Sequence, residues 1–227
     1  MKILAVDTST EFCSVALRVD DREIVRDCAA GQRHSSLLLP MIDEVLSEAQ
    51  LKLPQLDGIA FGAGPGSFTG LRIACGVVQG LAFVADLPVY GVSSLLALAE
   101  ASGAEKVIAA LDARMGEIYH AAFMRQDNTW QIVIAANLCK ANAAPLVSGA
   151  GWCGVGSGFV AHGAALSERY AERLGSVQAH LVPRACYIAR LAQPVFASGR
   201  GVPAHQALPM YIRDKVALTV TEQEGLR

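Results

Sequence analysis

A glycine-rich segment at residues 62–73 holds the residues with the clearest chemical potential. It reads Gly-Ala-Gly-Pro-Gly-Ser-Phe-Thr-Gly-Leu-Arg-Ile. The short apolar run before it, residues 58–61, predicts a buried strand, and the nearly uncharged run at residues 71–85 predicts a buried helix. A glycine-rich turn at a helix start exposes unpaired N–H groups that bind anions, and it also lets two chain segments approach closely. The segment therefore either cradles a phosphate or forms a tight contact.

This segment departs from two common phosphate-binding patterns. No Gly-Lys-Ser or Gly-Lys-Thr follows, so no lysine is placed to reach a phosphate. Asp86 directly follows the predicted helix, whereas the acidic residue of a dinucleotide-binding unit ends the next strand. The alternative is a tight turn in which Ser67 or Thr69 caps the helix. The residues that define this signature loop are Gly64, Gly66, Ser67, Thr69, Gly70 and Arg72.

A second candidate for phosphate binding lies between two predicted strands, at Asp7, Thr8, Ser9 and Thr10. Hydroxyl and N–H groups at such a hairpin can hold a phosphate, but the same residue types also favour an ordinary polar turn. A nucleotide site needs a matching hairpin in the second half of the chain. There, Asp112 is followed by Ala-Arg-Met, without the Gly and Thr that such a hairpin would supply. Residues 154–158, Gly-Val-Gly-Ser-Gly, could form a phosphate loop or a structural bend.

Histidine spacing argues against metal chemistry. The five histidines are His34, His120, His162, His180 and His205. None has the His-x-x-x-His or His-Glu-x-x-His spacing that points two rings at one ion, and no catalytic triad can be read from the sequence. We therefore expect no metal site. His34 is expected to be a cap or a contact residue of a helix that either starts or bends at Pro40.

Composition sets further bounds. The chain has 227 residues, is 52% apolar and carries a net charge of −2, without any run of Lys or Arg that would grip nucleic acid. Six cysteines without a Cys-x-x-Cys pair predict free thiols in a reducing cytosol. We expect the chain to enter a strand at once without a signal peptide, and we expect residues 71–85 to be too short to span a bilayer. We expect a cytoplasmic protein with no membrane association.

Apolar runs and turns predict two similar halves. Strands are expected at residues 2–7, 12–19, 22–29, 58–62 and 89–91 of the first half, with helices at 35–49 and 71–85, and at residues 107–112, 118–123 and 130–135 of the second half. Each half begins with an apolar strand that ends in an aspartate, followed by a turn and a returning strand, which indicates an internal duplication. Residues 141–167 are expected to be loops with a short strand, and the tail after Val216 to fray.

The two predicted helices of the first half are apolar over too wide an arc for one sheet to cover. Gly76 and Gly80 lie four residues apart and would let another helix approach closely. The helices therefore offer a face to a partner, unless they cover each other and the second half of the chain. Arg72, in the first helical turn, is expected to meet a phosphate or a carboxylate, with an intrachain salt bridge favoured. The partner-interface candidates are Leu38, Ile42, Val45, Ala74, Val77, Gly80 and Leu81.

Residues 64–72, Gly-Pro-Gly-Ser-Phe-Thr-Gly-Leu-Arg, closely resemble the signature of the bacterial TsaB (YeaZ) family. These proteins are paralogues of TsaD within the actin-like ATPase (ASKHA) superfamily. Residues 3–10, 33–40 and 208–214 also match, in the expected order, so the resemblance runs from residue 3 to about residue 215.

The resemblance implies an α/β fold with two actin-like lobes, residues 1–102 and 103–227, each of the order β-β-β-α-β-α. Residues 7–10 then correspond to a degenerate phosphate hairpin. TsaD has a His-x-x-x-His pair where residues 91–98 of this chain have no histidine. The implied function is therefore that of a non-catalytic subunit without a cofactor.

By resemblance, such a subunit binds and activates TsaD in the formation of N6-threonylcarbamoyladenosine (t6A) in tRNA. TsaE docks on the pair, tRNA is reached only through the complex, and the subunit alone forms a homodimer. The alternatives are an autonomous actin-like ATPase or kinase, which needs a second phosphate hairpin and a catalytic carboxylate, and, with less support, a peptidase.

Overall fold

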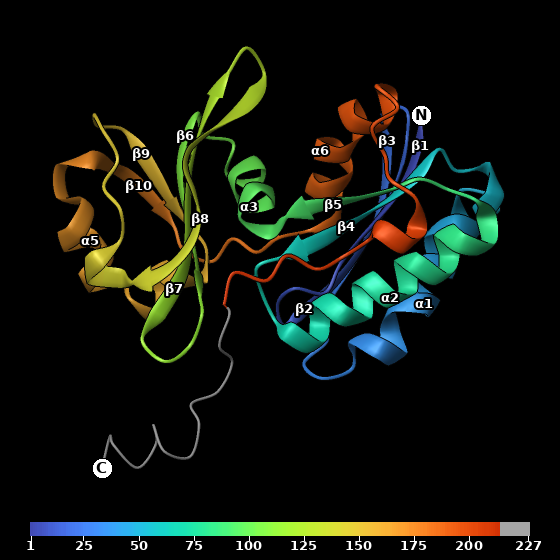
Figure 1. Cartoon of the computed structure of the whole chain (residues 1–227), viewed down its shortest axis with the longest axis horizontal. Helices are drawn as coiled ribbons and strands as arrows, with labels where there is room; N and C mark the ends of the chain where they lie inside the picture. Colours follow the sequence, from blue (N-terminus) through green and yellow to red (C-terminus); the bar gives the residue numbers. More distant parts are fainter. Residues whose placement is uncertain (214–227) are drawn as a thin grey trace.

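The computed structural model describes residues 1–213, which form two lobes, each built on a five-stranded sheet (Figure 1). The first sheet has the order β3-β2-β1-β4-β5 and consists of β1 (Lys2–Asp7), β2 (Phe12–Val19), β3 (Arg22–Ala29), β4 (Gly58–Gly64) and β5 (Val89–Ser93). The second has the order β10-β9-β6-β7-β8 and consists of β6 (Lys106–Asp112), β7 (Glu117–Gln126), β8 (Thr129–Lys140), β9 (Trp152–Val155) and β10 (Leu174–Gln178).

The two sheets repeat one topology. In each, the first three strands pair antiparallel, and the fourth and fifth pair parallel on the other side of the first. The order of the second sheet, read backwards, is therefore the order of the first. This confirms the two-lobed α/β fold with an internal duplication.

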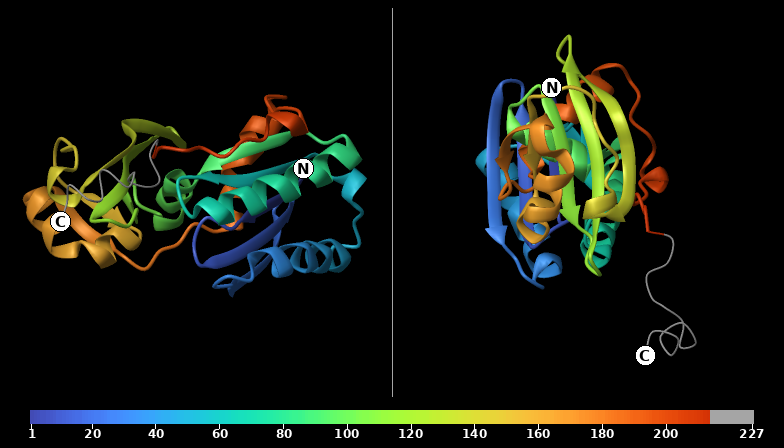
Figure 2. Two further views of the ribbon diagram at one scale, coloured as in Figure 1. Left: turned by 60° about the horizontal axis from the view of Figure 1, so that its bottom comes forward. Right: turned by 90° about the vertical axis from the view of Figure 1, so that its left-hand side faces the viewer.

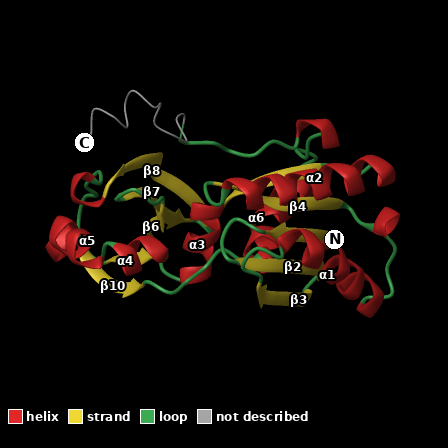
Figure 3. Cartoon of the chain, turned by 90° about the horizontal axis from the view of Figure 1, so that it is seen from below, coloured by secondary structure: helices red, strands yellow, loops and turns green. Residues whose placement is uncertain are grey.

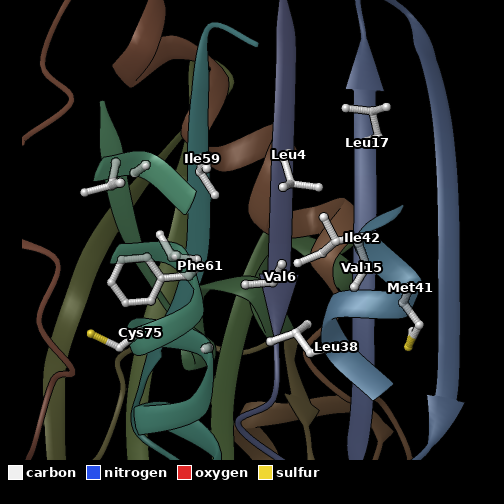
Figure 4. Close-up of a cluster of buried hydrophobic side chains, with 14 of the residues drawn as sticks. Leu4, Val6, Val15, Leu17, Leu38, Met41, Ile42, Ile59, Phe61 and Cys75 are labelled. Atoms are coloured by element: carbon white, nitrogen blue, oxygen red, sulfur yellow. The ribbon is translucent and has the colours of Figure 1, made fainter. Parts of the chain in front are cut away.

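Two helices cover one face of the first sheet. They are α1 (His34–Glu48) and α2 (Phe68–Ala85), which lie side by side (Figure 2, left). Strand residues that alternate toward this face, such as Leu4, Val6 and Val15, meet Leu38 and Ile42 of α1 in one buried cluster (Figure 4). This packing fixes α1 and α2 on the sheet.

The helices that end each half of the chain bridge the two lobes. From the first half, α3 (Ser94–Ser102) packs Leu95 and Leu98 against strands of the second sheet. From the second half, α6 (Ala185–Ala197) packs Ile188 and Ala192 against the face of the first sheet opposite α1 and α2. Figure 3 shows α3 between the lobes and α6 beside the first sheet. The division of the chain at residues 102 and 103 stays a prediction, and the packed first lobe includes α6.

The predicted strands and the first two helices are confirmed, with shifts of a few residues at their ends. Of the two alternatives for Pro40, a helix start at this residue is wrong, because α1 begins at His34 and includes Pro40, while a bend there stays a prediction. Pro40 is exposed, so water can reach the helix carbonyl that the missing N–H leaves free. The tail after Val216, which was expected to fray, lies outside the described residues.

The expectation of mostly loops at residues 141–167 is also wrong. The predicted short strand is β9, but two short helices follow it, α4 (Ser157–Ala161) and α5 (Gly163–Tyr170). Their Gly- and Ala-rich sequences give a weak helical signal. Helix α6 was not predicted, although its buried residues follow a helical period: Ile188, Ala189, Ala192, Val195 and Phe196.

Candidate functional site

The signature loop packs directly against the Asp7–Thr10 hairpin. The Ser67 N–H donates to the Ser9 carbonyl at 2.7 Å, and the Thr8 hydroxyl donates to the Gly70 carbonyl at 2.7 Å. A Cβ on Gly66 would overlap the Ser9 carbonyl oxygen, and one on Gly70 would overlap the carbonyl oxygen of Thr8. The glycines therefore serve a tight contact between two chain segments, the second of the two predicted alternatives.

The start of α2 is capped within this contact. Ser67 is the N-cap, and its Oγ accepts a hydrogen bond from the Gly70 N–H at 3.3 Å, so Ser67 and not Thr69 fills that role. Two of the N–H groups that could attract an anion, those of Ser67 and Gly70, already have partners within the protein.

The Asp7 carboxylate is enclosed beneath this contact. Its Oδ1 accepts hydrogen bonds from the Ser9 N–H at 3.0 Å and the Ser9 hydroxyl at 2.8 Å, while Oδ2 has no hydrogen-bond partner among residues 1–213. A Cβ on Gly62 would occupy the place of Oδ2, so only glycine leaves room for it. Burial raises the pKa of Asp7 to about 7, although the hydrogen bonds from Ser9 act in the opposite direction.

These residues do not fit the phosphate and metal of an actin-like nucleotide site. Asp7, Thr8 and Ser9 are all buried. In the second lobe, the Arg114 N–H donates a hydrogen bond to Asp112 Oδ1 at 3.0 Å, so this carboxylate oxygen already has a partner within its own turn. Among residues 1–213, no three His, Cys, Asp or Glu side chains form a group that could hold a metal ion.

Residues 154–158 form a structural bend. A Cβ on Gly154 would overlap the ring of Phe159, and one on Gly158 would lie 2.7 Å from the Ala110 side chain. The Ser157 hydroxyl accepts from the Asp112 N–H at 3.1 Å. The segment is thus used for close packing on the end of β6.

Arg72 makes a contact that the sequence analysis did not predict. Its guanidinium lies 3.8 Å from the centre of the Phe68 ring, and its Nε donates to the Tyr211 hydroxyl at 3.0 Å. The Phe68 and Tyr211 rings are themselves 5.5 Å apart. Within the described residues Arg72 has no salt bridge, so the expected carboxylate partner is not found among them, and the expectation stays a prediction. His34 is a contact residue, with Nε2 3.2 Å from the Phe12 carbonyl oxygen.

The chain segment at residues 207–213, here called the strap, ties α2 to the second lobe. The Ala207 carbonyl accepts from the Gln79 amide at 2.8 Å, and the Met210 N–H donates to the Ala63 carbonyl at 2.6 Å. At the far end, Arg213 Nη2 donates to Glu117 at 2.8 Å. Figure 1 shows the strap crossing between the lobes. The strap therefore includes most of the matching segment at residues 208–214, and this segment connects α2 to the second lobe.

The α1 and α2 helices leave an apolar surface uncovered. Phe83 is 81% exposed and Val84 83% exposed, and half-buried Val77 and Leu81 lie on the same helix. A groove of about 450 Å³ runs beside it, lined by Gly76, Gln79, Gly80, Phe83, Ala204 and His205. The second lobe does not cover this surface, which we call the α2 face.

For four of the residues predicted to lie at a partner interface, the prediction is wrong. Leu38, Ile42, Val45 and Ala74 are buried in the core between the helices and the sheet. Val77, Gly80 and Leu81 lie outside the fully buried core and remain candidates. Phe83 was missed, although it belongs to the apolar run on which the prediction rested.

The helix α2 is longer than predicted. It begins at Phe68 and has 18 residues, so by length and hydropathy alone it could span a membrane, and 33% of this stretch is buried in the fold. Its apolar surface is divided between the core of the first lobe and the α2 face.

Comparison with known proteins agrees with this geometry. A structure described as an uncharacterized protein with similarity to peptidase YEAZ from Pseudomonas aeruginosa is 41% identical with a TM-score of 0.87, covering 93% of this chain and 99% of that one. A structure of YeaZ from the same organism has 41% identity and a TM-score of 0.85, covering 92% of this chain and 99% of that one. The TsaD family model, tRNA N6-adenosine threonylcarbamoyltransferase, matches residues 28–223.

Curated relatives are similar over nearly their whole length. The Haemophilus influenzae protein is 37% identical over 95% of both chains, and the Escherichia coli protein is 37% identical over 96% of both. Both are named tRNA threonylcarbamoyladenosine biosynthesis protein TsaB. The two-lobed fold, with the signature loop packed against the Asp7–Thr10 hairpin (here called the closed hairpin), defines an actin-like protein of the TsaD type. Within that class, the chain belongs to the TsaB (YeaZ) family.

We predict that Gly70→Ala destabilises the protein whereas Gly76→Ala does not. The new methyl group of Gly70→Ala meets the Thr8 carbonyl, and overpacking of this kind costs about 1–3 kcal/mol. Gly76 lies in the same helix with open space around it, so alanine there stabilises by up to about 1 kcal/mol. Urea unfolding of both variants measures the difference. Equal stability of the two variants would contradict the tight contact.

We predict that stability falls as the pH rises from about 4 to 7, because of Asp7. Its pKa is about 7 in the folded protein and about 3.9 in the unfolded chain, so between these values the folded state binds more protons. Denaturant unfolding at several pH values should show this slope, and Asp7→Asn should reduce it. Asp43→Asn, which changes an exposed carboxylate on α1, is the control and should leave the slope in place.

Proposed function

We propose that this protein acts in the biosynthesis of threonylcarbamoyladenosine in tRNA as a non-catalytic subunit that binds and activates a TsaD-type paralogue. The observation that carries the proposal is the α2 face, an uncovered apolar surface on a rigidly held helix. The names of the two bacterial relatives support the pathway.

The α2 face has the properties of a docking surface. Large exposed apolar areas on a globular protein usually bind a partner. Gly76 and Gly80 have open space where a side chain would lie, so a helix from a partner can approach the α2 backbone closely. A paralogue with the same fold presents an equivalent helix pair. The resulting contact would be a four-helix packing related by a pseudo-twofold axis, and self-pairing of this chain would use the same surface.

The closed hairpin supports a non-catalytic role. A nucleotide-hydrolysing actin-like protein needs an open hairpin for phosphate, whereas here the signature loop fills that place and Asp7 is buried beneath it. The chain also lacks a run of basic residues, so its own affinity for tRNA is expected to be low, with tRNA and a docked TsaE held mainly by the complex.

We predict that Gly80→Arg abolishes both self-association and binding to the TsaD-type paralogue. The arginine fills the groove on the α2 face but is compatible with a helix, so the fold should be retained. Analytical ultracentrifugation gives the mass and circular dichroism the fold. Gly163→Arg, at another glycine with open surroundings but on the second lobe, is the matched control and should assemble normally.

One surface cannot hold two partners, so titration of the paralogue into the wild-type chain should dissolve the homodimer as the heterodimer forms. A preference of about 1.4 kcal/mol is enough for a tenfold excess of heterodimer. A larger assembly that keeps the homodimer contact would contradict the shared surface.

We predict that t6A formation in a reconstituted system requires this chain although the chain alone has no ATPase, kinase or peptidase turnover. The assay omits one subunit at a time and measures modified tRNA. Gly80→Arg should reduce the yield to the level seen without this subunit, while Gly163→Arg should not. Turnover by the highly purified chain alone that disappears in Asp7→Ala would refute the non-catalytic role.

A further inference from the structure

The helix α2 carries a charge at each end, and both charges are of the sign that the helix disfavours. Arg72 lies in the first turn and is the only charged residue from Phe68 to Ala85, and Asp86 is the residue that caps the C-terminus. The helix dipole favours anions at the N-terminus and cations at the C-terminus, so both residues oppose it. Both are exposed, and within residues 1–213 neither forms an ion pair. Contacts within the described chain therefore do not compensate these charges.

The Arg72 side chain is held in one position. Its guanidinium lies 3.8 Å from the centre of the Phe68 ring, and its Nε donates to the Tyr211 hydroxyl at 3.0 Å. The two terminal nitrogens have no hydrogen-bond partner among residues 1–213. Two donor groups held side by side match the two oxygens of a carboxylate, and a side chain that is already fixed loses little freedom when it binds one.

The two charges lie on either side of the glycines of the α2 face. A Cβ at Gly76 or Gly80 would meet nothing within 4 Å, so another helix can cross α2 most closely there. Arg72 lies about one turn before Gly76, and Asp86 lies about one and a half turns after Gly80. The two charged residues are almost four turns apart, so they lie on the same side of the helix at similar distances from the glycines.

We propose that a second copy of this chain packs its α2 antiparallel across Gly76 and Gly80, and that Arg72 of each copy binds Asp86 of the other copy. A twofold axis between the copies brings the start of one α2 to the end of the other and keeps the two charges on the same side of the contact. Both ion pairs then form together, and each charge lies beside the helix end that favours it.

The charges select this arrangement over two others. A parallel pairing would place each charge against its own equivalent in the other copy, and like charges at a contact repel. The helix α1 offers a different carboxylate, Asp43, which is exposed and forms no ion pair within residues 1–213, whereas Glu44 and Glu48 already pair with Arg26. The proposal rests on the α2 face as the docking surface of the proposed function, and it adds the orientation and the residues that determine self-recognition.

Charge reversal in the full chain tests the pairing, with the dissociation constant of the dimer measured by analytical ultracentrifugation. Arg72→Glu and Asp86→Lys should each raise this constant about tenfold or more, because each change places two like-charge pairs in the dimer. The double variant, Arg72→Glu with Asp86→Lys, restores opposite charges and should return the constant to within about threefold of the wild-type value. Asp43→Lys, the matched control on α1, should leave it unchanged.

Mixing the two single variants tests whether the contact is reciprocal. A mixed dimer contains one native pair and one reversed pair, and both are attractive, so the mixture should dimerise although neither variant does so well alone. Circular dichroism checks the fold of each variant. Asp86 has a positive φ, which asparagine also tolerates, so Asp86→Asn removes the charge without straining the cap and should weaken the dimer less than Asp86→Lys.

Three results would overturn the pairing: a wild-type chain that stays monomeric, a double variant as weak as the single variants, or a dimer lost in Asp43→Lys. Binding of the TsaD-type paralogue and t6A formation by the same samples separate this failure from that of the proposed function. If the paralogue still binds and t6A still forms, only the pairing is wrong. If the wild-type chain dimerises with these charge effects but neither binds the paralogue nor supports t6A formation, the pairing holds and the proposed function is wrong.

Discussion

The fold of the first lobe depends on one close backbone contact, where the signature loop crosses the hairpin that follows β1. Gly66 and Gly70 let the loop lie against the carbonyl groups of Ser9 and Thr8, and two hydrogen bonds of 2.7 Å fix the register. A side chain at either glycine would separate the segments. This contact sets where α2 begins and so fixes the position of the whole helix on the sheet.

The same contact buries Asp7 and also fixes α2, the helix whose apolar side is exposed. The strap holds α2 as well, through hydrogen bonds from Gln79 and Cys75 to the Ala207 carbonyl. A helix fixed at its start and along one side loses little further freedom when a partner binds its remaining side. The loop–hairpin contact and the strap therefore fix α2 in place and leave Phe83 exposed.

The sequence predicted the elements better than it predicted which side chains they bury. Strands with a strong apolar run, and the aspartate that ends the first strand of each half, could be located because these signals are local. The burial of Leu38 and Ala74 could not, because both helices are apolar over a wide arc and only the packing angle decides which residues face the sheet. Arg72 was expected to meet an anion because it lies in the first helical turn. Its contact with Tyr211 could not be predicted, because Tyr211 lies 139 residues away in the sequence. Helices α4 and α5 were missed because short Gly- and Ala-rich segments carry little periodicity.

The second lobe uses a glycine-rich loop for close packing, as the first lobe does. Its β9–α4 loop also carries a serine among glycines, and it packs on the end of β6 as the signature loop packs on the end of β1. Gly156 and Gly158 approach the backbone of Ala110, and the Ser157 hydroxyl accepts from the Asp112 N–H. In both lobes, therefore, the glycine-rich loop after the fourth strand closes over the strand that carries the aspartate. A loop used for anion binding would keep its N–H groups free and its neighbouring strand end open. Both loops instead serve packing, so the duplicated halves of the chain share one structural use of their glycine-rich loops.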